Sequence, residues 1–238
     1  MIDLPWPQIP ALEEGQVHLY WGRMGSALDR GANNLSESEL KRAGLFRFER
    51  DRQAFLARRT LLRQLLGRHS GLDSAAISIE ISDQGKPFQV SEPSLSFNLS
   101  HSADRFLIAL ARGRELGVDL QQHALKESAL GVARGVFTQG ELSELTALPD
   151  AEHERLFFRG WTRKEAALKC LGTGFLQEAR ELHVGLEEAA LDAQPWNAEG
   201  EPKLEGHRLL DLPAPSGFSA ALCCSGSDWS PQHFHQPT

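Results

Sequence analysis

The order of the predicted secondary structure elements constrains the fold of this chain more than any other feature. Apolar residues recur first with helical spacing over residues 37–68, and then with the alternation typical of strands over residues 77–120. The same order repeats, with helices predicted over residues 125–171 and strands over residues 182–224. Helices and strands segregated in this way fold as an α+β protein. The order therefore predicts two α+β halves that meet near residue 120.

The length and composition of the chain are compatible with this division. A chain of 238 residues suits one large domain or two of about 120 residues each, and an apolar share of 41% is enough to fill a core. We therefore predict an N-terminal half over residues 1–120 and a C-terminal half over residues 121–238.

Three sequence features bear on where the protein works. No run of about 18 apolar residues is present, and the N-terminus lacks the basic and then apolar pattern of a signal peptide. Cys170, Cys223 and Cys224 have the spacing of neither a disulfide framework nor a zinc site. We expect a reduced, cytoplasmic protein that does not work with a membrane.

The charge of the chain is unevenly distributed. Residues 41–68 hold nine Lys and Arg and two acids, a net charge of +7, whereas the remainder holds 16 basic and 30 acidic residues, a net charge of −14. Such a basic element usually faces phosphates or an acidic partner, although a solvated helix face is the simpler alternative. The acidic remainder and the lack of a base-reading motif disfavour nucleic acid as the partner.

The basic element is predicted to be helical. Ser36 and Glu39 have the spacing of a capping box, so a short helix is expected up to about Leu45. A longer helix over residues 49–68 follows, and its apolar side chains share one face: Ala54, Ala57, Leu61, Leu62, Leu65 and Leu66. Arg58 falls within that face. Because an unpaired buried charge is costly, we predict that Arg58 forms a structural ion pair.

Charged residues in a predicted strand and a predicted helix are the main catalytic candidates. Asp119 lies at the end of a short apolar strand, a common place for ligand residues, and Gln121 shares its face. Glu165 and Lys169 lie one turn apart on the long helix of the second half, where a surface ion pair is the simpler interpretation. If the fold brings Asp119 and Glu165 together, two carboxylates and an amide oxygen suit Mg²⁺, and Lys169 would neutralise phosphate charge.

The polar segment Ser100–Asp104 is a second candidate, and we predict that it is a turn between two strands. A lone histidine is more often structural, but Ser100 and His101 together could hold a phosphate. A Ser–His nucleophile pair is a poorer interpretation, because adjacent residues rarely orient as a catalytic dyad. The glycines of residues 172–174 end a helix, so they indicate a helix C-cap rather than a phosphate loop.

Four short motifs follow one another along the chain. They are GKP at residues 85–87, FNLSHS at 97–102, GVDL at 117–120 and WTRKEAALK at 161–169. In this order and at this spacing they resemble the 4′-phosphopantetheinyl transferases of the surfactin-activating type. With the basic helix, the resemblance covers roughly residues 40 to 175. It implies a pseudodimer of two similar α+β halves with the active site at their interface.

The resemblance also implies an activity. Coenzyme A would donate its 4′-phosphopantetheine arm to a serine of an acyl or peptidyl carrier protein, which releases adenosine 3′,5′-bisphosphate and converts the apo carrier to its holo form. Asp119 and Glu165 match the ligands of Mg²⁺, or of Mn²⁺ in its place, and Lys169 matches a lysine that contacts the phosphates. Glu165 is also a candidate general base. The residues that match coenzyme A contacts are Arg42, Lys86, Ser100, His101 and Lys169.

One position departs from the family pattern. Many bacterial members have an acid where this chain has Gln121, so the third metal ligand is neutral here. We expect the cation to depend more on Asp119, Glu165 and pyrophosphate oxygens, and to bind weakly without coenzyme A. The departure also motivates an alternative, in which the chain is a catalytically weak module that binds coenzyme A or a carrier protein.

The implied partner is an acidic carrier protein of fatty acid, polyketide or nonribosomal peptide synthesis. A chain of net charge −7 needs a local positive surface to steer such a partner. Arg155, Arg159 and Arg163, four residues apart on the long helix, are candidates, and salt bridges are the alternative. Because one chain would hold both halves, we expect a monomer.

Overall fold

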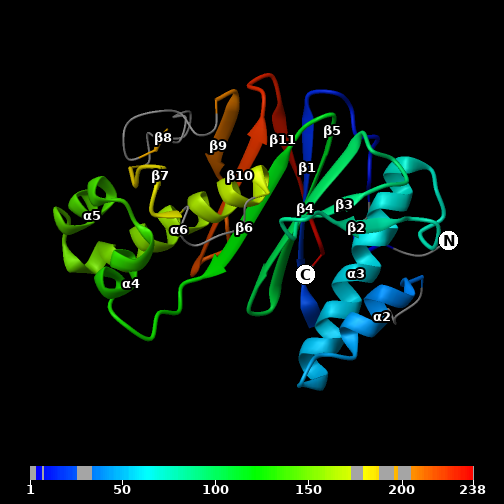
Figure 1. Cartoon of the computed structure of the whole chain (residues 1–238), viewed down its shortest axis with the longest axis horizontal. Helices are drawn as coiled ribbons and strands as arrows, with labels where there is room; N and C mark the ends of the chain where they lie inside the picture. Colours follow the sequence, from blue (N-terminus) through cyan, green and yellow to red (C-terminus); the bar gives the residue numbers. More distant parts are fainter. Residues whose placement is uncertain are drawn as a thin grey trace.

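The structure, a computed structural model, describes residues 4–6, 8–25, 34–172, 179–187, 196–197 and 205–237. Two central β-sheets have α2 and α3 at one end of the molecule and α4 and α5 at the other, while α6 lies across β6 and β10 (Figure 1). The first sheet has the strand order β11-β1-β5-β4 and the second has the order β6-β10-β9. The protein is therefore α+β and built in two halves, as the element order predicts.

The first half contains most of the first sheet and the basic helices. Its elements are β1 (Gln16–Arg23), α2 (Glu37–Ala43), α3 (Glu49–Ser70), β2 (Ile79–Ile81), β3 (Pro87–Gln89), β4 (Leu95–Ser102) and β5 (Arg105–Arg112). Ser36 and Glu39 form the predicted capping box of α2. The apolar face of α3 packs on the first sheet, and Leu61, Leu62 and Leu65 are fully buried there, as predicted. This packing fixes the direction in which α3 leaves the sheet.

The second half contains the second sheet and the remaining helices, and its first strand, β6, runs across the boundary predicted at residue 120. Its elements are β6 (Leu116–Gln122), α4 (Ala129–Val136), α5 (Gln139–Thr146), α6 (Asp150–Leu171), β7 (Leu182–His183), β8 (Trp196–Asn197), β9 (His207–Asp211), β10 (Phe218–Ser225) and β11 (Ser230–His235). Strand β11 was not predicted, because its sequence SPQHFH lacks apolar alternation. It pairs in parallel with β1 and so returns the chain to the first sheet. None of the helices in the described part of the chain is long and apolar enough to cross a bilayer.

The prediction of a turn over Ser100–Asp104 is wrong. Strand β4 continues through Ser102 and pairs with β5 as far as Arg105, so the turn is confined to Ala103 and Asp104. Ala103 has a positive φ of 51°, which lets the chain reverse in two residues. Polar residues extend the strand here because alternate side chains bond to β6 instead of pointing into water. Ser100 and His101 are therefore strand residues.

Candidate active site

Polar side chains of β4 join the two sheets. Asn98, Ser100 and Ser102 alternate along β4 and so point in the same direction. Each accepts a hydrogen bond from an alternate backbone amide of β6, at 2.9 Å for Asn98 and Val118, 3.1 Å for Ser100 and Leu120, and 3.0 Å for Ser102 and Gln122. Three side chains of the FNLSHS motif thus join β4 to β6 with hydrogen bonds, in place of the backbone pairing found within a sheet. They hold the centre of β6, where Asp119 lies, beside the end of β4.

Helix α6 lies directly on β6 at Gly117. A Cβ atom at this position would be 2.2 Å from the Ala166 carbonyl oxygen and 2.3 Å from the Cys170 backbone nitrogen. Only glycine permits so close a contact between the two backbones. The close packing of α6 places Glu165 and Lys169 against Asp119, two residues further along β6.

The sequence-predicted carboxylates and lysine form one cluster. Lys169 Nζ lies 2.6 Å from Asp119 Oδ1 and 3.9 Å from Glu165 Oε2. Ser100 Oγ donates a hydrogen bond of 2.7 Å to the same Asp119 oxygen. Glu165 and Lys169 do form the ion pair of the simpler interpretation, but the shorter contact of Lys169 is to Asp119 of the neighbouring strand. The cluster therefore combines α6, β6 and β4.

The unsatisfied oxygen of Asp119 fits a cation. Asp119 is buried, and its Oδ2 has no hydrogen-bond partner among the described residues. An orphaned carboxylate oxygen at this depth is unusual unless a ligand completes it. Burial raises the pKa of Glu165, Lys169 opposes that shift, and the negative charge of Asp119 adds to it. Two carboxylate side chains this close suit a hard cation such as Mg²⁺.

A cation held by Asp119 and Glu165 would find few further ligands among the described residues. Among the residues that the structure describes, no group of three or more His, Cys, Asp or Glu side chains could hold a metal ion. Gln121 lies two residues beyond Asp119 on the same face of β6, half-buried, and in the described part of the chain its amide makes no hydrogen bond to the cluster. A cation here would complete its shell with water and substrate oxygens.

Arg58 is the residue of this region that sequence reasoning misinterpreted. The predicted ion pair is wrong: Arg58 is buried, its guanidinium donates a hydrogen bond of 3.8 Å to Met24 Sδ, and no carboxylate of the described residues is in contact with it, although the charge of Asp51 acts on it from further away. The other fully buried cations have carboxylates in contact, at 2.7 Å each: Arg63 with Glu39, Arg163 with Asp211, and Lys164 with Glu141. Burial accordingly lowers the pKa of Arg58 to about 10. The sequence signal was present, because all four positions three and four residues away on α3 are apolar.

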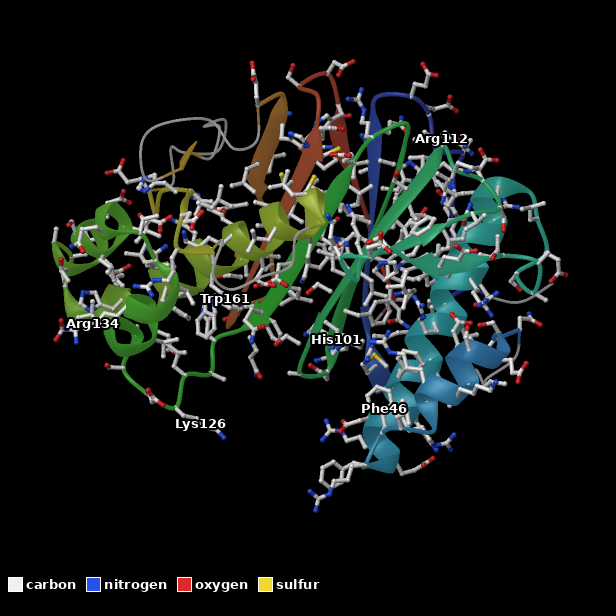
Figure 2. The ribbon with its side chains drawn as sticks, viewed as in Figure 1. Phe46, His101, Arg112, Lys126, Arg134 and Trp161 are labelled. Atoms are coloured by element: carbon white, nitrogen blue, oxygen red, sulfur yellow. The ribbon has the colours of Figure 1, made fainter. Side chains whose placement is uncertain are left out.

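His101 lies close enough to Arg58 and to Lys169 to be affected by the charges of both. His101 lies near the end of β4 (Figure 2). Its pKa is lowered to about 4, first by desolvation of the ring and then by the positive charges of Arg58 and Lys169. His101 is therefore neutral at pH 7 and lies within electrostatic range of cations from both halves. Arg58, His101 and Lys169 together make a region suited to an anion.

Two predicted coenzyme A contacts lie outside the cluster. Lys86 Nζ donates a hydrogen bond of 2.8 Å to the carbonyl oxygen of Cys170 at the C-terminal end of α6, and Lys86 lines a cavity of about 420 Å³. Arg42 lies exposed on α2 with its guanidinium 5.8 Å from the centre of the Phe55 ring. Gly172 ends α6 as a left-handed C-cap, as predicted. Gly174 lies outside the described residues.

The arginines predicted to steer an acidic partner are used within the protein. Arg163 and Arg159 lie 2.7 and 3.2 Å from carboxylate oxygens of Asp211 on β9, and Arg155 lies 2.6 Å from Glu152. The structure therefore favours the salt-bridge alternative, with the difference that two of the three pairs reach a neighbouring strand rather than the same helix.

The chain is similar to known proteins over both of its halves. A family model described as "4'-phosphopantetheinyl transferase superfamily" matches residues 115–210, and one described as "4'-phosphopantetheinyl transferase, N-terminal" matches residues 20–112. The 4′-phosphopantetheinyl transferase HetI of Nostoc sp. is 33% identical over 98% of this chain and 97% of its own length. These matches cover both halves of the chain.

More distant relatives match a shorter part. The 4′-phosphopantetheinyl transferase of Bacillus subtilis is 27% identical over 61% of this chain and 64% of its own length. The L-aminoadipate-semialdehyde dehydrogenase-phosphopantetheinyl transferase of Xenopus laevis is 30% identical over 60% of this chain and 51% of its own length. Together with the full-length match to HetI, these findings establish that the chain belongs to the 4′-phosphopantetheinyl transferase superfamily and to its surfactin-activating type.

Proposed function

We propose that the Asp119, Glu165 and Lys169 cluster is the centre at which this chain transfers the 4′-phosphopantetheine arm of coenzyme A to a serine hydroxyl of a carrier protein, with a divalent cation bound by Asp119 and Glu165. The observation that carries the proposal is the buried, unpartnered Oδ2 of Asp119 beside the Lys169 ammonium. A catalytically weak binding module is not favoured, because the relatives are named as transferases. We further propose a cytoplasmic monomer that acts without nucleic acid or a membrane.

The residues of the cluster suit phosphoryl transfer, which depends mainly on positioning and on charge stabilisation. Bound Mg²⁺, or Mn²⁺, would supply Lewis-acid polarisation of the pyrophosphate oxygens. Lys169 neutralises the charge that grows on the pyrophosphate as its P–O bond to adenosine 3′,5′-bisphosphate breaks. Ser100 orients Asp119 through its 2.7 Å hydrogen bond. In these roles each side chain acts from the position that it has in the structure.

In this proposal Glu165 takes the proton of the acceptor serine. The serine oxygen forms a bond to the phosphorus that carries pantetheine, and its proton passes to Glu165 directly or through one water. Burial raises the pKa of Glu165 in the cation-free protein, and a carboxylate beside the reacting oxygen is a suitable acceptor for this proton. In this proposal Gln121 contributes at most a neutral oxygen, and Lys86 and Arg42 contact more distant parts of coenzyme A.

The test of the function is a labelling experiment. The purified chain is mixed with coenzyme A carrying a fluorescent group on its thiol, an apo carrier protein and Mg²⁺. We expect covalent label on the carrier serine, with loss of the reaction in excess EDTA and recovery on addition of Mg²⁺ or Mn²⁺. Absence of label on every carrier class tested would contradict the proposed function, and undiminished labelling in EDTA would contradict the cation.

A second expectation concerns Arg58. We propose that its guanidinium binds a phosphate of coenzyme A that lies beyond the reacting pyrophosphate. Arg58→Gln should then raise the dissociation constant for coenzyme A at least about tenfold, since a charge-assisted hydrogen bond contributes ~1.5–3 kcal/mol. The free energy of unfolding of the apo protein should stay the same or rise, because the variant removes a buried charge without a carboxylate partner.

Arg63→Gln is the matched control on the same helix. Arg63 lies 2.7 Å from Glu39 and donates to two backbone carbonyls, so its loss should destabilise the protein by about 3 kcal/mol. Calorimetric titration of coenzyme A and of 3′-dephospho-coenzyme A, together with chemical denaturation, measures both effects. If Arg58→Gln behaved like Arg63→Gln in unfolding and left coenzyme A affinity unchanged, Arg58 would be a structural residue.

A further inference from the structure

The turn between α2 and α3 exposes an unusual amount of apolar surface. Leu45 is 86% exposed and Phe48 is 60% exposed, and Leu40 and Phe46 extend the same patch. We refer to Leu40, Leu45, Phe46, Arg47, Phe48 and Arg50 as the α2–α3 tip. Four of the nine exposed large apolar side chains recorded for the described residues therefore fall within nine positions. A gathering of this kind marks an interaction site more often than an isolated exposed leucine does.

The tip is held in a fixed shape. The backbone amides of Leu45 and Phe46 donate to carbonyls at the end of α2, at 3.1 and 3.3 Å. The Phe46 ring lies 5.4 Å from that of Phe55, which is buried between the two helices. A surface that is already ordered loses little conformational entropy when a partner binds. The exposed aromatic rings of the tip are therefore held in place before a partner binds.

The tip also has uncompensated positive charge. Of the acids near it, Glu37 is paired with Lys41 at 2.8 Å and Glu49 with Arg52 at 2.6 Å, while Asp51 acts on the buried Arg58 through its charge. Arg47 and Arg50, by contrast, contact no carboxylate among the described residues, and the Arg47 guanidinium lies 5.3 Å from the centre of the Phe48 ring. Aromatic and arginine side chains are the types enriched at the energetic centre of protein interfaces. The complementary surface is apolar and acidic.

The tip lies within reach of a body placed over the active site. Figure 2 shows Phe46 on the same side of the molecule as His101, with Lys126 of the second half on the opposite flank. Along α3, Phe48 and Arg58 are separated by ten residues, or about 15 Å of helix. A folded protein of about 100 residues has a radius of gyration of ~13 Å. A protein acceptor of that size is wider than the 15 Å of helix that separates Arg58 from the tip.

We propose that the α2–α3 tip docks the acceptor carrier protein through an apolar surface surrounded by acidic side chains. The inference rests on the proposed function, because that function supplies the protein acceptor. A second copy of this chain is disfavoured as the occupant, since a two-fold contact would bring Arg47 and Arg50 close to their own copies. Because the net charge of the chain is −7, it repels an acidic partner at long range. The positive charge of the tip would attract such a partner locally.

The experiment compares two tip variants with a matched control. The tip variants are Phe46→Ser with Phe48→Ser, and Arg47→Glu with Arg50→Glu. The control is Ile81→Thr, which removes an apolar side chain of similar exposure, 53%, from β2. For each protein, the anisotropy of a fluorescent apo carrier gives the carrier dissociation constant, calorimetry gives coenzyme A affinity, and labelling gives kcat and KM.

We expect both tip variants to raise the carrier dissociation constant and KM at least tenfold, with kcat at saturating carrier and coenzyme A affinity within twofold of wild type. The wild-type KM should rise with salt, and that of the Arg47→Glu, Arg50→Glu variant should not. Unchanged carrier binding in both variants, or a wild type that binds no carrier, would overturn the docking proposal. So would tip-dependent binding to anionic vesicles or tip-dependent dimerisation in sedimentation. Absence of transfer in a wild type that binds carrier would instead contradict the proposed function and leave the docking result standing.

Discussion

Gly117→Ala is expected to reduce transfer at least about a hundredfold without changing any side chain of the cluster, since a displacement of ~1 Å in a positioned site costs that much. The added Cβ would lie 2.2 Å from the Ala166 carbonyl oxygen and 2.3 Å from the Cys170 amide nitrogen. Both are backbone atoms of α6, so no side chain can rotate to relieve the overlap. The helix must move away from β6.

That movement separates the halves of the cluster. Asp119 lies on β6 and Lys169 on α6, and their 2.6 Å contact depends on the distance between the two elements. Overpacking of this kind also costs about 1–3 kcal/mol or more in stability. For a chain of this size, 3 kcal/mol lowers the thermal midpoint by roughly 6–12 °C. Differential scanning calorimetry and labelling kinetics measure the two consequences separately.

Gly135→Ala is the matched control. Gly135 lies in α4, and a Cβ there has no neighbour within 4 Å, so the substitution should leave transfer unchanged and raise stability by up to about 1 kcal/mol. Wild-type kinetics in a folded Gly117→Ala protein would show that the close packing of α6 on β6 does not position the cluster. Coenzyme A affinity measured on the same variant separates a shifted site from an unfolded one.

Much of the fold could be predicted because local patterns and tertiary packing agree. The apolar face of α3 and the capping box at Ser36 encode their structure within a few residues, and both are confirmed. The sequence of β11 has no such local pattern. This strand forms because it pairs with β1, which lies at the other end of the chain. The extension of β4 through Ser102 was missed for a related reason. Its polar side chains bond to β6, which a strand pattern based on apolar alternation cannot reveal.

The residues of the candidate site that lie in recognisable motifs could be predicted from the sequence. Arg58 could not, because what distinguishes it is the lack of a carboxylate partner in the folded protein. Asp119, Glu165 and Lys169 were singled out by residue type and come together in the structure. Arg58 was assigned an ion pair because a buried charge usually has one, and the structure has no carboxylate in contact with it among the described residues. Arg58 departs from the rule that a buried charge has a partner of opposite charge. Departures of this kind are expected at functional sites, so they single out Arg58 as a candidate.

Asp119→Asn is expected to lower the rate of transfer by about 10²–10³-fold, the usual loss when one preorganised electrostatic group is removed from a transition state. The substitution keeps the shape of the side chain and an oxygen that can accept from Ser100. It removes the negative charge that pairs with Lys169 and the orphaned Oδ2. Because Lys169 is 29% exposed, its ammonium can be hydrated after the loss, so the fold should be retained.

Three measurements separate the roles of Asp119. Labelling kinetics should show the fall in kcat, calorimetry should show coenzyme A affinity in EDTA within about threefold of wild type, and circular dichroism should report a native fold. Those three results together place the defect in the cation and in the transition state rather than in substrate binding. A kcat within a few-fold of wild type at saturating Mg²⁺ would exclude Asp119 from the centre of the reaction.

Gln121→Glu should have the opposite effect on metal binding. Gln121 lies on the same face of β6, two residues from Asp119, and the wild-type chain offers a neutral amide where a carboxylate would add a second charged ligand from that strand. A hard cation gains affinity with each carboxylate ligand, so Gln121→Glu should increase Mg²⁺ affinity in the absence of coenzyme A. Calorimetric titration of Mg²⁺ should detect weak binding to the wild type, tighter binding to Gln121→Glu and none to Asp119→Asn. Equal Mg²⁺ affinity in all three proteins would show that the cation does not bind at β6. A cation held by Asp119 would bind differently after at least one of the two substitutions.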